Sequence, residues 1–463
     1  MPADLNAFHS FLKPSEILSL SDVQLADQRR RFTAAPDMVL QPHSVESVQK
    51  IMRHCFEQKI PVTPQGGNTG LCGAAVAQGG VLLNLSRLNR IREVNLADNS
   101  ITVEAGCILQ HVQEAADRAD RLFPLSLASE GSCQIGGNIA CNAGGLNVLR
   151  YGSMRDLVLG LETVLPDGTL VSHLHPLHKN TTGYDLRHLF IGSEGTLGVI
   201  TAATLKLFAK PQTTATAWVG VDSIDDAVSL LTDVQTHFAE RLCSFELISR
   251  FALSLSSGFL QTQQPTDAEW HILLELTDSL PDSGLHDALA EFLFEHGREN
   301  CILAQSEQER QTLWALRENI SAAQRDLGTS IKHDIAVPIG EVAGFVHHCA
   351  ADLVQQFPDI KIVCFGHLGD GSLHYNTFLP NIVSNEVYAY EDAVNQAVYR
   401  QVLNHHGTIA AEHGIGMIKK HWLNAVRHPA ELSLMRAVKA HLDPHNIMNP
   451  GKLLPDIVNS LSK

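Results

Sequence analysis

The sequence lacks the features of a membrane-spanning, nucleic-acid-binding or disulfide-bonded protein. No apolar run reaches the ~20 residues needed to cross a bilayer. The nine cysteines contain no Cys-x-x-Cys pair, which favours reduced thiols over disulfides or a thiolate zinc site. With 34 basic and 50 acidic residues, the chain carries a net charge of −16, which disfavours nucleic acid and anionic membranes as partners.

Two further signals are missing. The segment MPADLNAFHSFLKPSE has no basic region followed by an apolar stretch and is poor in arginine, so we expect neither a secretory signal nor a mitochondrial transit peptide. We therefore predict a cytoplasmic protein. The chain also has no GxxxxGK[ST] loop and no strand–GxGxxG–helix unit, which excludes the usual nucleoside-triphosphate and Rossmann sites.

The patterns that are present predict an α+β protein of two or three domains. Residues 40–210 alternate short β-like runs with glycine-rich turns and helical stretches. The segment FAKPQTTATAW, with Pro211 and a threonine cluster, is typical of a linker. Beyond it, WVGV, WHILLEL and KIVCFGH indicate strands separated by long amphipathic helices, which predicts a small antiparallel sheet covered by helices.

Three glycine- and asparagine-rich segments stand out in the first half: PQGGNTG at 64–70, the stretch 123–152, and GSEGTLG at 192–198. Glycines allow backbone N–H groups to approach an anion closely. Each segment alone is explained equally well by a tight turn. Three of them within 140 residues indicate a large polyanionic cofactor.

These segments resemble the FAD-binding domain of the vanillyl-alcohol oxidase and p-cresol methylhydroxylase (PCMH) superfamily. The patterns PQGGNTG, IGGN-x-A-x-NAGG and GSEGTLG-x-I-T are similar to those of its D-lactate and D-2-hydroxyglutarate dehydrogenase branch. The resemblance runs from about residue 35 to the end of the chain. It implies non-covalent FAD held by Pro64, Gly66, Gly67, Asn68, Thr69, Gly70, Ser129, Gly136, Gly137, Asn138, Asn142, Gly144, Gly145, Glu194, Gly195, Ile200 and Asn449.

The expected domain order follows from the same comparison. Residues 1–34 form an N-terminal helical extension and residues 35–211 a PCMH-type FAD-binding domain. Residues 212–420 form the substrate domain, and residues 421–463 return to the flavin site.

In the second half, CFGHLGDGSLHYN predicts a hairpin that carries His367 and His374 at its facing ends. Asn376 lies on the same strand face as His374, and the segment GTIAAEHGIG adds Glu412 and His413. Two histidines and a carboxylate form a common catalytic zinc set, and iron or manganese suits the same ligands. A buried hydrogen-bonded histidine pair remains the competing interpretation, and Asp370 is a rival ligand that we assign to the turn.

The family resemblance implies that His367, His374 and Glu412 bind a divalent metal, for which we expect zinc, and that His413 is the catalytic base. It also implies that Arg317, Ser321, Lys332 and Asn376 bind the substrate. Without the resemblance, solvated surface cations are the favoured interpretation of Arg317 and Lys332. On the predicted helix, Arg317 and Ser321 share one face, and we assign no role to His333 or Asp334.

The predicted function is FAD- and metal-dependent oxidation of a D-2-hydroxy acid, D-2-hydroxyglutarate or D-malate, to the 2-keto acid. The hydride passes to flavin N5 while His413 accepts the hydroxyl proton. The alternatives are a D-lactate or glycolate dehydrogenase, an oxidase that uses oxygen, and a non-catalytic flavin electron-transfer subunit. We expect a small anionic substrate, an electron-transfer flavoprotein or quinone as acceptor, and an assembly state compatible with a homodimer.

Overall fold

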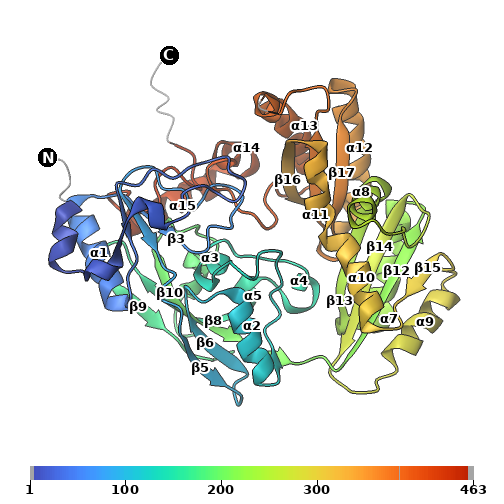
Figure 1. Cartoon of the computed structure of the whole chain (residues 1–463), viewed down its shortest axis with the longest axis horizontal. Coiled ribbons are helices and arrows are strands. Elements are labelled where there is room, and N and C mark those ends of the chain that lie inside the picture. The colour runs from blue at the N-terminus through green and yellow to red at the C-terminus, as the bar shows by residue number, and fades with distance from the viewer. Residues whose placement is uncertain (1–4, 385, 457–463) are drawn as a thin grey trace. The chain divides into compact units, whose positions relative to one another are not determined.

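The computed structural model describes residues 5–384 and 386–456, which divide into two compact units. Unit 1 comprises residues 1–145, 152–209 and 412–463, and unit 2 comprises residues 146–151 and 210–411. In Figure 1, unit 1 contains the blue to green elements and the dark red ones, and unit 2 the light green to orange ones. The chain thus leaves unit 1 twice and returns to it twice.

Unit 1 contains two main sheets. The first has the order β1 (Ile17–Leu18), β2 (Met38–Leu40), β4 (Val81–Asn84), β3 (Val62–Gln65), and its last three strands are parallel. The second is antiparallel, with the order β5 (Ile91–Asn95), β6 (Ser100–Glu104), β10 (Val199–Lys206), β8 (Val158–Val164), β9 (Leu170–His173). A two-stranded ladder pairs β7 (Arg121–Leu122) with β11 (Phe208–Ala209).

The helices of unit 1 begin and end where the sequence provides caps. Helix α1 (Val45–Gln58) starts after Ser44, whose hydroxyl accepts the N–H of Ser47, and stops at the left-handed Lys59. The other helices are α2 (Leu109–Arg118), α3 (Ile135–Ala140), α5 (Met154–Leu157), α6 (Arg187–Phe190), α14 (Leu423–Val426) and α15 (Pro429–Leu442). Residues 5–22 form three short 3-10 helices, Leu5–Ser10, Pro14–Glu16 and Leu20–Asp22, together with strand β1.

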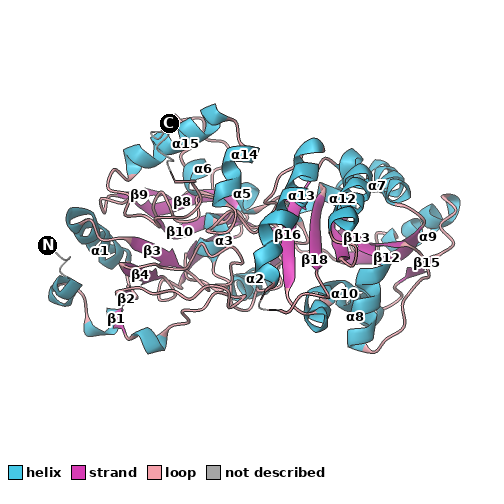
Figure 2. Ribbon diagram, turned by 90° about the horizontal axis from the view of Figure 1, so that it is seen from above, coloured by secondary structure: helices cyan, strands magenta, loops and turns pink. Residues whose placement is uncertain are grey.

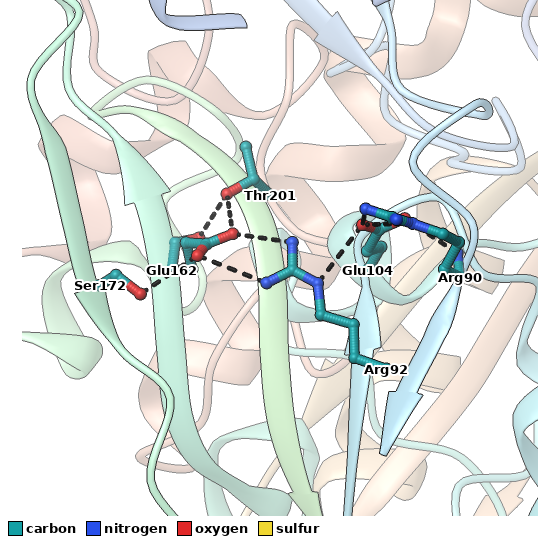
Figure 3. Close-up of polar contacts among 6 residues, drawn as sticks. All are labelled: Arg90, Arg92, Glu104, Glu162, Ser172 and Thr201. Carbon is teal, nitrogen blue, oxygen red and sulfur yellow. Dashed lines mark hydrogen bonds and ion pairs between the residues drawn. The ribbon is translucent and has the colours of Figure 1, made fainter. Parts of the chain in front are cut away.

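A charged network crosses the five-stranded sheet of unit 1 (Figure 3). Arg92 donates to Glu104 at 3.3 Å and to Glu162 at 3.1 Å, and so bridges β6 and β8 across β10. The network is completed by Arg90 on Glu104 and by Ser172 and Thr201 on Glu162. Both carboxylates are buried, so removing Arg92 would leave buried charge less well compensated. The network fixes the strand end that precedes Ala105, whose carbonyl accepts the N–H of Gly136 at 2.7 Å.

Unit 2 is built on one antiparallel sheet, as predicted. Its order is β15 (Cys301–Leu303), β12 (Thr213–Val221), β14 (Trp270–Asp278), β13 (Leu242–Ser249), β17 (Lys361–His367), β18 (Ser372–Phe378), β16 (Ser330–Ala336). The mixed helix-and-sheet architecture is that expected from the sequence. The predicted linker FAKPQTTATAW contains the boundary between the two units, but strands occupy most of it, because β11 ends at Ala209 and β12 begins at Thr213. β-Branched threonines fit a pleated strand, and this preference prevails over the local proline signal.

Helices cover both faces of the unit 2 sheet (Figure 2). Helices α7 (Ile224–Phe238), α12 (Val342–Gln356) and α13 (Glu391–Asn404) lie on one face, and α8 (Arg250–Leu260) and α10 (Glu307–Glu318) on the other. Helix α9 (Leu285–Glu295) packs on α7 through the Phe238–Phe292 ring pair, and the short α4 (Val148–Tyr151) and α11 (Ile320–Ala323) complete the unit. On α12, the apolar residues at helical spacing are buried: Val342, Phe345, Val346, Cys349 and Leu353.

Candidate functional site

The three glycine-rich segments of unit 1 converge in space. A Cβ added to Gly67 would lie 2.0 Å from the carbonyl oxygen of Ser132, so the first segment packs directly on the second. The ideal Cβ of Gly66 lies 3.8 Å from the backbone nitrogen of Gly137, and that of Gly195 lies 3.3 Å from Pro64. Residues 64–70, 129–145 and 192–198 therefore form one structure, called the glycine cradle below.

The cradle presents unused hydrogen-bonding groups. Within the described residues, the amides of residues 66–70 have no backbone or side-chain acceptor. Asn68 lies in the left-handed region with φ 53°, and its side-chain NH2 group donates to the carbonyls of Gln24 and Ala26, while its backbone N–H remains unused among the described residues. In the same described part of the chain, the buried oxygens Oε1 of Gln134 and Oδ1 of Asn449 lack partners. Consecutive backbone N–H groups can bind a phosphate, and buried acceptor oxygens can bind hydroxyl or N–H donors of a ligand. These groups together fit a dinucleotide such as FAD.

Two of the predicted cofactor residues hold the cradle together. Glu194 is buried, and its carboxylate accepts the N–H groups of Ile415 and Gly416 at 2.7 Å each. Burial raises the pKa of Glu194 in spite of these bonds and of nearby Lys419. Asn449 donates to the carbonyls of Ala74 and Glu194, at 2.9 and 2.7 Å. Both residues thus link the C-terminal segment to the cradle.

The remaining predicted cofactor residues occupy the same region of unit 1. Asn142 accepts from Ser153 and from the N–H of Arg155, and the buried Asn138 contacts Cys133 Sγ at 3.6 Å. Gly145, with φ 109°, donates its N–H to the carboxylate of Glu412 at 3.1 Å. Thr69, Gly70, Ser129, Gly136, Gly144 and Ile200 lie in the loops, in α3 and at the start of β10.

In unit 2, the predicted hairpin is present. Strands β17 and β18 pair so that His367 faces Ser372 and His374 faces Phe365. The two imidazole centroids are 5.8 Å apart, and their nearest ligating nitrogens lie within 4.8 Å of one another. Asp370 lies in the turn, where its carboxylate accepts the N–H of Ser372 at 3.0 Å, in agreement with the turn role assigned to it.

A buried carboxylate that the sequence analysis missed orients His367. Glu246 on β13 lies opposite His367, and its Oε1 is 2.7 Å from His367 Nδ1. Its Oε2 accepts from Nε and Nη2 of Arg317, at 2.8 and 2.7 Å. Burial would raise the pKa of Glu246, but His367 and Arg317 outweigh it and lower the pKa to about 2. An ionised Glu246 can only accept, so His367 carries its proton on Nδ1 and presents Nε2 as the ligating nitrogen.

A second missed carboxylate lies on β16. Asp334 pairs with His374 across β16 and β18, and its carboxylate lies within 4.8 Å of a His374 ring nitrogen. Asp334 is 2% exposed. Within unit 2, His374 therefore lies close to His367 and also to Asp334, and both residue types suit a divalent metal.

The predicted substrate residues lie in different settings. Arg317 is buried, paired with Glu246, and its guanidinium lies 4.8 Å from the centre of the Phe365 ring. Ser321 is exposed, because the helix breaks at Asn319 and the expected shared face is lost. Lys332 and Asn376 are cross-strand neighbours on β16 and β18, and the buried Asn376 donates to Gln324 at 2.9 Å.

Glu412 and His413 begin the last segment of unit 1. They directly follow Ala411, whose N–H lies 3.4 Å from the carbonyl of Asp334 in unit 2. The last residue of unit 2, Ala411, therefore lies beside the strand that carries Asp334.

No helix within residues 5–384 and 386–456 has the length and apolar character that a bilayer crossing requires.

Comparisons with known proteins agree with both units. Residues 36–173 match an FAD binding domain, and residues 210–453 match the C-terminal domain of FAD linked oxidases. A D-2-hydroxyglutarate dehydrogenase of Stutzerimonas stutzeri is 38% identical over 98% of this chain and 99% of its own. A putative mitochondrial D-lactate dehydrogenase of Schizosaccharomyces pombe is 34% identical over 97% of this chain and 85% of its own.

Among solved structures, p-cresol methylhydroxylase superposes with a TM-score of 0.77 at 16% identity, over 98% of this chain and 96% of its own, which identifies the fold. The chain therefore belongs to the FAD-linked oxidases with a PCMH-type FAD-binding domain, a family that includes the D-2-hydroxyglutarate dehydrogenases it resembles over its full length.

Proposed function

We propose that this chain is an FAD- and metal-dependent dehydrogenase that oxidises D-2-hydroxyglutarate, or a related dicarboxylate such as D-malate, to the 2-keto acid. The observation that carries the proposal is the 2.7 Å contact between His367 Nδ1 and Glu246. Metal-bound histidines usually donate their other ring N–H to a carboxylate, which fixes the tautomer and the ring orientation. A histidine held this way beside a second histidine, in a member of an FAD-linked family, supports a metal-assisted oxidation.

The proposed metal ligands are His367, His374 and Glu412, with zinc as the ion. Asp334, beside His374, is a further candidate that the sequence analysis did not include. A bound divalent ion would lower the pKa of the substrate hydroxyl, as zinc does for water. Bound FAD, held by the glycine cradle, would supply the hydride acceptor.

The chain's own residues would do the remaining work. His413 accepts the hydroxyl proton while the C2 hydrogen leaves as hydride. Because Glu246 engages Nε and Nη2 of Arg317, Nη1 is the nitrogen available to meet the substrate carboxylate. Lys332, half-buried on β16, binds the distal carboxylate, and Asn376 beside it fixes the substrate backbone.

A second cation distinguishes the proposed substrate from the alternative one. Lactate has a single carboxylate, for which one arginine contact suffices, whereas a dicarboxylate requires a cation at each end. The pair Arg317 and Lys332 therefore favours the dicarboxylate. The proposed electron acceptor is an electron-transfer flavoprotein or a quinone.

The test is anaerobic mixing of the purified holoprotein with D- and L-2-hydroxy acids while the flavin absorption band is followed. We expect D-2-hydroxyglutarate to bleach the flavin fastest and the L-acids to leave it oxidised. A flavin that dithionite reduces but that no 2-hydroxy acid reduces would overturn the proposal.

A further inference from the structure

Unit 2 contains a second histidine cluster on the outer helices. His348 of α12 and His405, which follows α13, have their Nδ1 and Nε2 atoms 3.1 Å apart. Their rings are stacked, with centroids 5.2 Å apart and planes 24° apart. Nδ1 of His405 lies 2.7 Å from the carboxylate of Glu341. This group, the His348–His405 pair, has no part in the function proposed above.

The tautomer of His405 follows from its contact with the carboxylate. The Glu341 carboxylate accepts a hydrogen bond from Nδ1–H, so the lone pair of His405 resides on Nε2 and points to His348. Gly344 leaves room for the ring, because a Cβ there would lie 2.9 Å from His405 Cε1. The arrangement is the carboxylate–histidine relation that orients metal-binding imidazoles, and it is the same relation that Glu246 has to His367.

The nitrogen separation suits one metal ion. An ion at the usual metal–nitrogen distance of about 2.0–2.1 Å from both atoms would subtend roughly 100° across the 3.1 Å separation. That angle lies between the octahedral and tetrahedral values, and imidazole nitrogen suits zinc, nickel and copper. The ion would take the place of the proton that the two rings now share.

The surroundings favour a cation and allow it to enter. His348 is exposed, so the site opens to solvent, while His405 is 9% exposed and held in place. Glu341 and Asp352 supply negative charge near the two rings, and His348 is one of the groups that lower the pKa of Asp352. The opposing charges are Arg400, which pairs with Asp352, and the exposed His347 and His406.

We propose that the His348–His405 pair is a second metal site, which binds one zinc, nickel or copper ion with water as the other ligands. The ion clips α12 to α13, two helices that pack on each other over the strands of the sheet. The proposal is independent of the function proposed above, because none of its residues lies on β16, β17 or β18.

The test is titration of the chelator-treated, FAD-loaded full chain with nickel ion, monitored by calorimetry. His348→Gln should bind one equivalent fewer than the wild type. His347→Gln, the exposed neighbour on the same helix, is the matched control and should bind the wild-type number. Glu341→Gln should retain the site with 10- to 100-fold weaker affinity, the usual effect of losing the orienting carboxylate.

Two further readouts do not depend on activity. Copper bound at this site should show nitrogen splitting from two imidazoles in electron paramagnetic resonance, and His348→Gln should lose one nitrogen. Nickel should raise the melting temperature of the wild type more than that of His348→Gln, since a ligand that binds the native state stabilises it. Equal nickel stoichiometry in the wild type and in folded His348→Gln would overturn the proposal and would leave the pair as a shared-proton hydrogen bond.

Discussion

Glu246 lies directly opposite His367 on adjacent strands, and the carboxylate of Glu246 is 2.7 Å from the Nδ1 atom of His367. The same carboxylate holds Arg317 with its second oxygen at 2.7 Å. One buried acid therefore orients both a predicted metal ligand and a predicted substrate-binding cation. The three side chains act as a unit, so changing the acid affects both partners.

Glu246→Gln keeps the size of the side chain but removes its charge. We expect metal affinity to fall 10- to 100-fold, because His367 loses the group that fixes its tautomer. FAD content should stay unchanged. Equilibrium dialysis against zinc measures the first effect and the flavin absorption the second.

A matched control exists in the same sheet. Glu275 is a largely buried carboxylate that accepts from Thr216, Trp314 and Arg310. Glu275→Gln should lower stability without altering zinc affinity. Equal zinc affinity in the wild type and Glu246→Gln would show that Glu246 serves Arg317 alone.

The glycine cradle predicts a steric effect at Gly67. In Gly67→Ala, the new Cβ would lie 2.0 Å from the Ser132 carbonyl, so the first two glycine segments must separate. We expect purified Gly67→Ala to be colourless or to lose FAD readily, and to be less stable by about 1–3 kcal/mol, the usual cost of overpacking. Gly258→Ala, on an exposed helix position with open space around it, should be neutral or stabilising by about 0.5–1 kcal/mol. Full FAD content in Gly67→Ala would refute the cradle.

Substitutions should distinguish the proposed base, His413, from a proposed metal ligand, His374. His413→Ala should keep FAD and metal but lose turnover by roughly 10² to 10⁴-fold, the usual contribution of a positioned base. His374→Ala should lose the metal together with turnover. Metal analysis and steady-state kinetics on the two variants decide the assignment. Loss of metal from His413→Ala, with activity restored by added zinc, would identify His413 as a ligand.

Substrate choice should depend on Lys332. A charged hydrogen bond contributes about 1.5–3 kcal/mol, so Lys332→Ala should weaken kcat/KM for D-2-hydroxyglutarate by about 10- to 150-fold. The same variant should change D-lactate oxidation little. Arg317→Ala should damage both reactions and also destabilise the fold, because it leaves Glu246 buried and uncompensated. Equal losses on both substrates in Lys332→Ala would favour a D-lactate enzyme.

Lys452 predicts a stability effect that depends on pH. Burial and nearby Lys420 lower the pKa of Lys452 to about 8 in the folded chain. Below pH 8 Lys452 is charged in both the folded and the unfolded chain, so the folded chain carries the full free-energy cost of burying that charge beside Lys420. Between pH 8 and 10.5 the unfolded chain binds more protons than the folded one, so stability from this group rises with pH.

Lys452→Met should therefore raise the melting temperature at pH 7, and its advantage should shrink as the pH increases from 8 to 10.5. Lys361→Met, at an exposed position on β17, serves as the control and should show no such trend. Thermal melts of the three proteins across this range provide the measurement. A difference independent of pH would contradict the assigned cause.

The features predicted from the sequence are those encoded in contiguous residues. The His367–His374 hairpin follows from one turn, and the buried stripe of α12 follows from helical periodicity. The family motifs located the cofactor domain for the same reason. The strand Thr213–Val221 was predicted only for its last part, WVGV, because Pro211 suggested a break and the β propensity of the threonines was underweighted.

The contacts that complete the site depend on distant residues. Glu246 is 121 positions from His367 in the sequence, and only the strand order β13–β17 brings them together. An acid within the apolar strand LCSFELIS was the available signal. Asp334 was passed over because its significance comes from the cross-strand register with His374. The prediction that Arg317 and Ser321 share a helix face was wrong, because the helix is interrupted at Asn319, where no proline or glycine in the sequence marks the interruption.

The double exit of the chain from unit 1 constrains the order of events during synthesis. Residues 210–411 emerge from the ribosome before the segment that closes unit 1, and domains generally fold as they emerge. Strand β3 needs Ile447 and Asn449 for hydrogen bonds to Val62, and Glu194 needs Ile415 and Gly416. Synthesis of unit 1 starts first, but the unit is completed only by its last segment, residues 412–463. The glycine cradle therefore lacks its contacts with Ile415, Gly416 and Asn449 until that segment has been made.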